Sequence, residues 1–248
     1  MIWNSISGKK KRKYKWLDYD RTTWPPSKWN DHPEWQFELI RASSCISFRK
    51  KFIFVHIGKT GGHPQVRGVF ERKLKDAVNS PDLDKPINDK KWNEYFKYTF
   101  VRNPWDKVVS AYYSPITWFD RRPNDSLLNE LPTDYGPHNI TFNYFVKNIL
   151  WDENGDPCQP HWIEQHKFIE DFRCRGEIWV DFIGKFENLI EDWGKVCNQI
   201  GIDEKLPYTN KNPIKPKRNY QEYYDDETIE IVRSKYKRDI ELFHYTFE

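Results

Sequence analysis

The chain has 248 residues and a formal net charge of +3, so it is long enough for one domain and is not a polycation as a whole. Charged residues make up 31% of the chain and no run of about 18 apolar residues occurs, which argues against a membrane-spanning helix. Sixteen Phe, fourteen Tyr and twelve Trp supply the material for an apolar core.

Residues 1–48 differ in composition from the rest and predict an N-terminal arm in front of a domain at 49–248. Lys9 to Lys15 holds six basic residues in seven, and tryptophans and prolines follow it. This pattern is neither a signal peptide nor a membrane anchor, so we expect a cytoplasmic protein, with a truncated lumenal domain as the alternative. The arm is either a contact site for an anionic polymer or a solvated segment whose tryptophans pack on the domain.

The first predicted strand covers residues 52–55, which are aromatic or β-branched and too few for a helix. A glycine-rich turn follows, and Pro64 suits the first turn of a helix expected over about 64–78. Glycines let successive backbone N–H groups point inward, which is typical of an anion site, although the spacing of a nucleotide-binding P-loop is not met. The candidate ligands in this turn are Gly58, Lys59, Thr60, Gly61 and Gly62.

A second strand, loop and helix covers residues 98–113 and repeats this design. Pro104 suits the first helical turn and Asn103 its N-cap. Arg102 at the end of the strand offers a planar fork suited to a phosphate, and Ser110 can reach the same oxygens from the helix. The sequence therefore predicts two anion sites that follow two strands.

Further elements follow these two units. Residues 116–140 predict a long surface excursion, and apolar spacing marks a short helix near 142–150. We expect a strand over 178–183, a helix over about 188–200 and a helical tail over 225–243. Two strand-loop-helix units with a third strand favour an α/β sheet that binds its ligand at the carboxyl ends of the strands.

The segments FVHIGKTGG (54–62) and FVRNPWDKVVSAY (100–112) resemble the two cofactor-binding signatures of the sulfotransferases, in particular the membrane-type carbohydrate sulfotransferases and their soluble microbial relatives. The resemblance continues through Gln165 to Ile169, Val180 to Leu189 and Tyr223 to Ile240. It implies a P-loop-like three-layer fold with a central parallel sheet flanked by helices. It also implies 3′-phosphoadenosine 5′-phosphosulfate as the sulfuryl donor, a carbohydrate hydroxyl as the acceptor, and Arg218 in a basic loop as a ligand of the 3′-phosphate.

The expected mechanism places Lys59 and the loop N–H groups on the departing phosphate, with no metal. The catalytic base is open, because relatives often carry a histidine between the two signatures and residues 76–97 contain none. His63, next to the first loop, is the first candidate among seven histidines, and Glu71 is another. His56 on the buried strand and His161 and His166 near a helix start are each expected to be structural.

Relatives usually carry proline at the position of Gly58, and threonine and serine at those of His63 and Pro64. These departures keep open a catalytically silent nucleotide-binding module of the same fold. A nucleotide kinase or hydrolase is the third hypothesis, and the missing P-loop spacing weighs against it.

Overall fold

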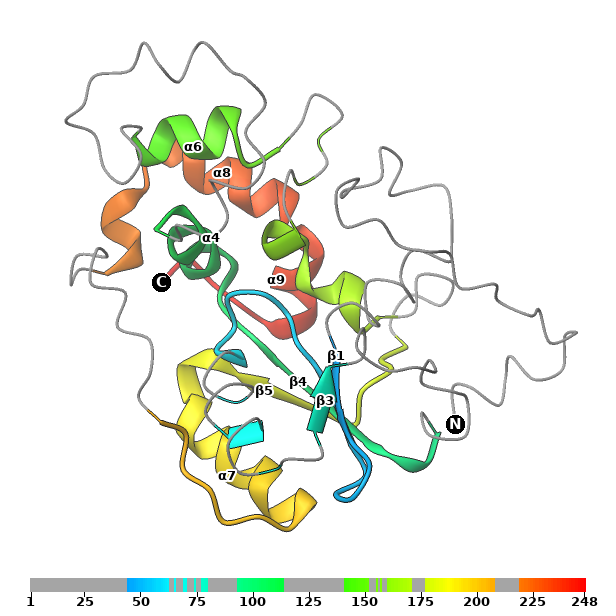
Figure 1. The fold of residues 1–248 in the computed structure, drawn as a ribbon. Coiled ribbons are helices and arrows are strands. Elements are labelled where there is room, and N and C mark those ends of the chain that lie inside the picture. Colours follow the sequence, from blue (N-terminus) through cyan, green and yellow to red (C-terminus); the bar gives the residue numbers. More distant parts are fainter. Residues whose placement is uncertain are drawn as a thin grey trace, which may run out of the picture.

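The computed structural model describes residues 44–62, 65, 69–70, 74, 77–79, 93–113, 141–151, 155, 157, 160–170, 177–207 and 219–248 (Figure 1). Its centre is a five-stranded sheet in the order β3-β1-β2-β4-β5. The strands are β1 (Ser44–Ser47), β2 (Phe52–Val55), β3 (Ala77–Asn79), β4 (Phe96–Val101) and β5 (Phe182–Lys185). The helices in the described residues are α4 (Pro104–Tyr112), α6 (Phe142–Asn148), α7 (Leu189–Ile200), α8 (Asp226–Lys235) and α9 (Lys237–Phe243). Short 3-10 turns are η7 (Pro160–Trp162), η8 (Gln165–Phe168), η9 (Phe186–Asn188) and η10 (Tyr220–Tyr223).

The sheet is mixed. Strand β4 lies between β2 and β5 and is parallel to both, whereas β1 is antiparallel to both β2 and β3. The expected α/β class is confirmed, but the expectation of a wholly parallel central sheet is wrong. Only residues 48–51 join β1 to β2, and so short a connection permits antiparallel pairing alone. The carboxyl ends of β2, β4 and β5 therefore share one edge, where their loops meet.

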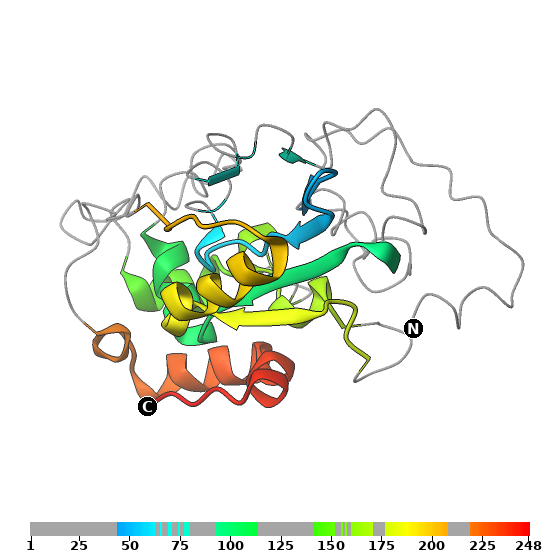
Figure 2. The ribbon, with the colours of Figure 1, turned by 90° about the horizontal axis from the view of Figure 1, so that it is seen from below.

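Both faces of the sheet are covered by helical segments. Side chains alternate along β2, so Phe52 and Phe54 pack on one face and Ile53 and Val55 on the other. The first face is buried under α7 through Trp193, and the second under η8, α9 and the residues that follow α9. Figure 2 shows α7 on one side of the strands and α8 with α9 on the opposite side.

A second core lies beyond the carboxyl end of β4. Helix α4 packs there against α6 and α8, with Trp105, Phe145 and Tyr236 among its buried aromatic side chains. Helices α6 and α8 run side by side in Figure 1, and Lys147 on α6 forms a 2.5 Å ion pair with Glu227 on α8. This core fixes the helix that carries the second predicted anion loop.

The structure confirms several predicted elements and corrects others. The strand at 52–55, the helix after Asn103 and the helix at 188–200 are β2, α4 and α7. The helix expected over about 64–78 does not include 77–79, because these residues form β3 against β1. The strand expected at 178–183 begins later, at Phe182, since Ile178 makes only an isolated bridge to Glu170. The helical tail is two helices, α8 and α9, that meet at Tyr236.

The sheet begins before the expected domain boundary at residue 49. All four residues of β1 are buried, so this strand belongs to the domain rather than to the arm. Residues 1–43, including Lys9 to Lys15, and the excursion at 116–140 lie outside the described residues, and the division of the chain stays a prediction there. Within the described part, no helix has both the length and the apolar character needed to cross a bilayer.

Candidate active site

The loop at residues 58–62 leaves β2 at the edge where the three parallel strands end. Lys59 and Gly61 have φ angles of 70° and 86°, in the left-handed region. A lysine in that region costs of order 1–3 kcal/mol and persists only where the surroundings fix it. Thr60 is buried, and its hydroxyl donates to the carbonyl oxygen of Ile57 at 2.8 Å, which ties the turn to its own backbone. Turns with left-handed residues direct neighbouring N–H groups into one concavity that accepts anions.

Each glycine of this loop has a side chain from outside the loop close to the position where its Cβ would lie. A Cβ on Gly58 would lie 2.6 Å from Cδ2 of His161, and one on Gly62 would lie 2.1 Å from Cδ2 of His56. A Cβ on Gly61 would lie 3.0 Å from Cδ2 of Leu189 at the start of α7. The glycines are therefore needed for close approach as well as for the turn.

Arg102 at the end of β4 joins all three carboxyl-end loops. Its Nε donates to Oδ2 of Asp106 at 2.8 Å and its Nη1 to the carbonyl oxygen of Lys59 at 3.0 Å. The guanidinium carbon lies 4.0 Å from the ring centroid of Phe186, which follows β5. Because the side chain is held from three directions, its fork is fixed relative to the first loop.

Asn103 and Glu187 hold the start of α4. The Asn103 side chain accepts from the backbone N–H of Trp105 at 3.1 Å, which confirms the predicted N-cap. The backbone N–H of Asn103 donates to Oε1 of Glu187 at 2.7 Å, and the Tyr245 hydroxyl donates to Oε2 at 3.1 Å. Glu187 thus links the turn after β5 to the second anion loop.

Gln165 and Asp239 attach the segment at 160–170 to this edge. The buried side chain of Gln165 accepts from the N–H of Arg102 and donates to the carbonyl oxygen of Arg102, each at 2.8 Å. The Asp239 carboxylate accepts from the backbone N–H groups of Gln165 and His166 and pairs with the His166 ring at 2.8 Å. Burial raises the pKa of Asp239, but its bonds to His166 and Gln165 outweigh burial and hold that pKa below its usual value.

Lys107 on α4 is a buried cation directly behind the loops. Its Nζ donates to the carbonyl oxygen of Ile163 at 2.8 Å. The pKa of Lys107 is lowered to about 8, mainly by burial. The carboxylates of Asp239 and Glu164 raise this pKa, whereas the charges of Lys59 and Arg102 lower it further. Three cationic side chains therefore lie close enough to repel one another. A bound anion would reduce this repulsion.

His161 on η7 lies directly against the first loop and is partly exposed. Burial lowers its pKa to about 4, and the charges of Lys59, His56 and Lys107 add to the effect. The ring is therefore neutral at pH 7, which leaves one ring nitrogen as an acceptor.

A comparison of the sequence with models of protein families gives a match that agrees with this fold and geometry. A family model described as the sulfotransferase family matches residues 64–246, which is well over half of the chain. The chain belongs to the sulfotransferase family. The match includes the second signature and confirms the family that the resemblance implied.

Individual relatives of this chain are distant. The chain is 33% identical over 121 residues to an uncharacterized protein of Archaeoglobus fulgidus, a match covering 48% of this chain and 79% of that protein. It is 24% identical over 185 residues to carbohydrate sulfotransferase 14 of Danio rerio, covering 68% of this chain and 49% of the relative. It is 23% identical over 248 residues to the Mus musculus protein of that name, covering 89% of this chain and 64% of the relative. The chain thus spans about half to two thirds of these carbohydrate sulfotransferases, and no solved structure gives a significant match.

The structure brings the predicted residues of both loops to one edge of the sheet. Gly58 to Gly62 and Arg102 meet there, and Ser110 is partly exposed two turns along α4. His63 and Arg218 lie outside the described residues, so their roles stay predictions. Among the described residues no group of three or more His, Cys, Asp or Glu side chains is placed to hold a metal ion.

Sequence reasoning missed the parts that His161, Lys107 and Gln165 play at this edge. Their partners are the loop glycine Gly58 and backbone groups that lie 56 and 63 residues away in the chain. No local pattern marks such contacts, although the buried side of α4 contains Lys107 among apolar residues and so hints at a special partner.

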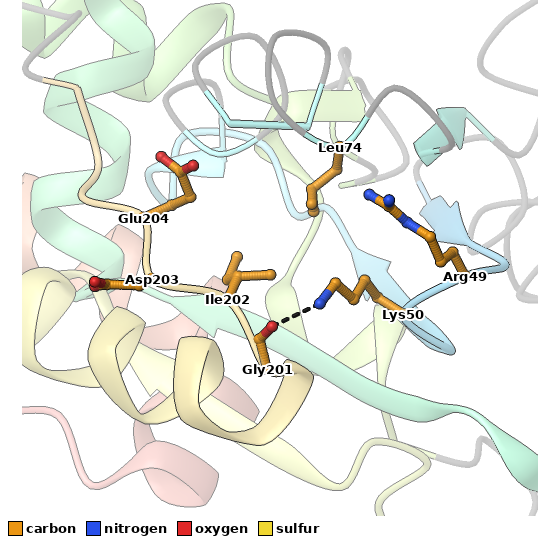
Figure 3. Close-up of a pocket in the computed structure, with 7 residues that line it drawn as sticks. All are labelled: Arg49, Lys50, Leu74, Gly201, Ile202, Asp203 and Glu204. Carbon is orange, nitrogen blue, oxygen red and sulfur yellow. Dashed lines mark hydrogen bonds between the residues drawn. The ribbon is translucent and has the colours of Figure 1, made fainter.

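An open cavity of about 400 Å³ lies at the opposite end of β2 (Figure 3). Its walls come from the turn between β1 and β2, from Leu74 and from residues 201–204 after α7. Nζ of Lys50 donates to the carbonyl oxygen of Gly201 at 2.6 Å. The candidate site follows the carboxyl end of β2, whereas this cavity precedes its first residue. The cavity is therefore separate from the anion loops.

Proposed function

We propose that the protein transfers the sulfuryl group of 3′-phosphoadenosine 5′-phosphosulfate to an acceptor hydroxyl, with carbohydrate as the acceptor class. The observation that carries the proposal is the bond between Nη1 of Arg102 and the carbonyl oxygen of Lys59, because it joins the two anion loops into one site. A donor with two separate phosphate groups needs two such loops at a fixed separation. The match to the sulfotransferase family supports the same reaction class.

The residues present suit an anionic donor. Lys59 lies in the concave loop with Thr60, and its cation is suited to the charge that develops on the departing phosphate. Asp106 and the Lys59 carbonyl take three of the five guanidinium N–H groups of Arg102, so among the described residues two are left for an oxyanion. Ser110 is proposed to bind the same phosphate as Arg102, and Arg218 to contact it from the basic loop.

The carbohydrate acceptor rests on the names of the relatives, which are carbohydrate sulfotransferases in fish and mouse. A silent nucleotide-binding module of the same fold would share the donor site and lack turnover. Binding and turnover must therefore be measured separately.

The test is calorimetric titration of 3′-phosphoadenosine 5′-phosphate into the full chain, compared with ATP and magnesium. We expect the bisphosphate to bind more tightly than ATP. A charge-assisted contact contributes about 1.5–3 kcal/mol, so Lys59→Ala should weaken bisphosphate binding by about 10- to 100-fold. Lys237→Ala, at an exposed lysine on α9, is the matched control and should leave the affinity unchanged.

Ser110→Ala should weaken the bisphosphate while leaving adenosine 5′-phosphosulfate, which lacks the 3′-phosphate, unaffected. Tighter binding of ATP, or equal effects of Lys59→Ala and Lys237→Ala, would refute the proposed donor. Tight bisphosphate binding without transfer to any unsulfated oligosaccharide or to water would favour the silent module.

A further inference from the structure

The described part of the chain contains four histidines, His56, His161, His166 and His244, and they differ in their surroundings. The His166 ring is committed to the Asp239 carboxylate, and His244 is exposed after α9. The His56 ring stacks on Phe54 with 5.5 Å between the centroids and fills the space beside Gly62. These three rings therefore have structural or surface positions.

His161 lies against the first residue of the anion loop. The Cβ position of Gly58 would be 2.6 Å from Cδ2 and 3.0 Å from Cα of His161, so the ring and its backbone both contact the loop. The side chain is partly exposed, and no hydrogen bond of its ring to another described residue is seen. The imidazole therefore lies beside the loop that we propose to hold the donor.

Two buried donors fix the turn that carries His161. Nζ of Lys107 on α4 donates to the carbonyl oxygen of Ile163, and the Tyr236 hydroxyl between α8 and α9 donates to that of Trp162. The next residues are held in turn through Gln165, which bonds both backbone groups of Arg102. Such support holds a reacting group in place before the substrate binds.

We propose that His161 is the general base of the transfer reaction, the residue that takes the proton from the acceptor hydroxyl. This inference rests on the proposed function. As the acceptor oxygen bonds to sulfur, the bond from sulfur to the bridging phosphate oxygen breaks and its electron pair stays on the phosphate. The acceptor proton moves to the free ring nitrogen of His161 and is later released to water.

The protonation state of His161 suits this role. Among the described residues, the charged or titratable groups near it are Lys59 from the loop, His56 from the end of β2 and Lys107 from α4. All three oppose a proton on the ring, so the ring is neutral when the site is empty. A bound phosphosulfate brings negative charge beside the ring, which raises its proton affinity at the time when the acceptor is deprotonated.

The test uses the full chain and separates binding from turnover. Affinity for 3′-phosphoadenosine 5′-phosphate is measured by calorimetry. Turnover is measured as release of sulfate or sulfated product from labelled 3′-phosphoadenosine 5′-phosphosulfate, with water and with unsulfated oligosaccharides as acceptors. The variants are His161→Ala, His63→Ala as the rival base, and His244→Asn as the matched histidine control.

For His161→Ala we expect a 10²- to 10⁴-fold loss of turnover with bisphosphate affinity within threefold of the unmodified chain. Added imidazole should restore part of the rate, because it can enter the space that the ring leaves, and the acidic limb of the pH profile should disappear. His244→Asn should change neither affinity nor turnover.

Turnover of His161→Ala within threefold of the unmodified chain overturns the proposal, as does a large loss confined to His63→Ala. Bisphosphate binding by the unmodified chain with no turnover to water or oligosaccharide also overturns it and leaves the donor site standing. If the unmodified chain does not bind the bisphosphate, the proposed function itself is wrong and the inference falls with it.

Discussion

Replacing Gln165 with methionine tests whether the segment at 160–170 is attached to the edge of the sheet through backbone bonds. Methionine is close in volume to glutamine, so it leaves little cavity but removes both bonds to Arg102. The backbone N–H and the carbonyl oxygen of Arg102 then lose the two partners that this side chain supplies in a buried environment. Each buried group without a partner costs about 1–3 kcal/mol, so the free energy of unfolding should fall by about 2–6 kcal/mol.

Urea unfolding followed by tryptophan fluorescence measures this loss, and a fall of about 3 kcal/mol corresponds to a melting temperature lower by roughly 6–12 °C for a chain of this size. Gln199→Met on the exposed side of α7 is the control for the same chemical change and should stay within about 0.5 kcal/mol of the unmodified chain. A loss below about 1 kcal/mol for Gln165→Met, with an unchanged urea dependence, would show that these bonds do not hold the segment in place.

Three further outcomes are expected. Glu187→Ala removes the acceptor of both the Asn103 N–H and the Tyr245 hydroxyl and should cost about 2–3 kcal/mol in urea unfolding, whereas Glu187→Gln, which keeps one acceptor, should cost less than half of that. The pKa of His161 is lowered to about 4, so the ring binds a proton at a higher pH in the unfolded chain than in the folded chain. The free energy of unfolding should therefore fall as the pH is lowered from 6.5 to 4. This loss in the free energy of unfolding should be about 1–2 kcal/mol, because the ring is partly exposed. Urea unfolding at pH 7 and 4.5 should show that His161→Asn loses about 1–2 kcal/mol less than the unmodified chain does. Lys107 has its pKa lowered to about 8, so stability should rise with pH between 8 and 10.5, and Lys107→Met should lack this rise when unfolding is compared at pH 7.5 and 10.

The elements that sequence reasoning placed correctly are those whose signals are local. Strand β2 combines four apolar residues with glycines that follow, and α4 has Asn103 as its cap and Pro104 in its first turn. The convergence of the two anion loops also followed, because parallel neighbouring strands place their carboxyl ends at one edge. The strand and the helix need only residues that are close together in the chain, whereas the convergence of the loops depends on the expected parallel pairing.

The wrong expectations depended on pairing between distant residues. Ala77 fits a helical spacing after the first loop, yet it pairs with Ser47 of β1, and a three-residue edge strand carries no sequence signal of its own. The strand expected at 178 starts at Phe182 because its register is set by Tyr98 on β4. Local propensity gives way where a neighbouring strand offers backbone partners.

Gly58 shows how the structure explains a departure from the family pattern. The proline that the family resemblance implies at this position would place its Cβ 2.6 Å from Cδ2 and 3.0 Å from Cα of His161. A flexible side-chain tip could move away, but the Cα belongs to a turn that Lys107 and Tyr236 hold through its carbonyl oxygens. The glycine and the histidine are therefore mutually dependent: the loop lacks a side chain at this point because the imidazole occupies its place. The missing side chain of Gly58 leaves the space in which His161 lies against the loop.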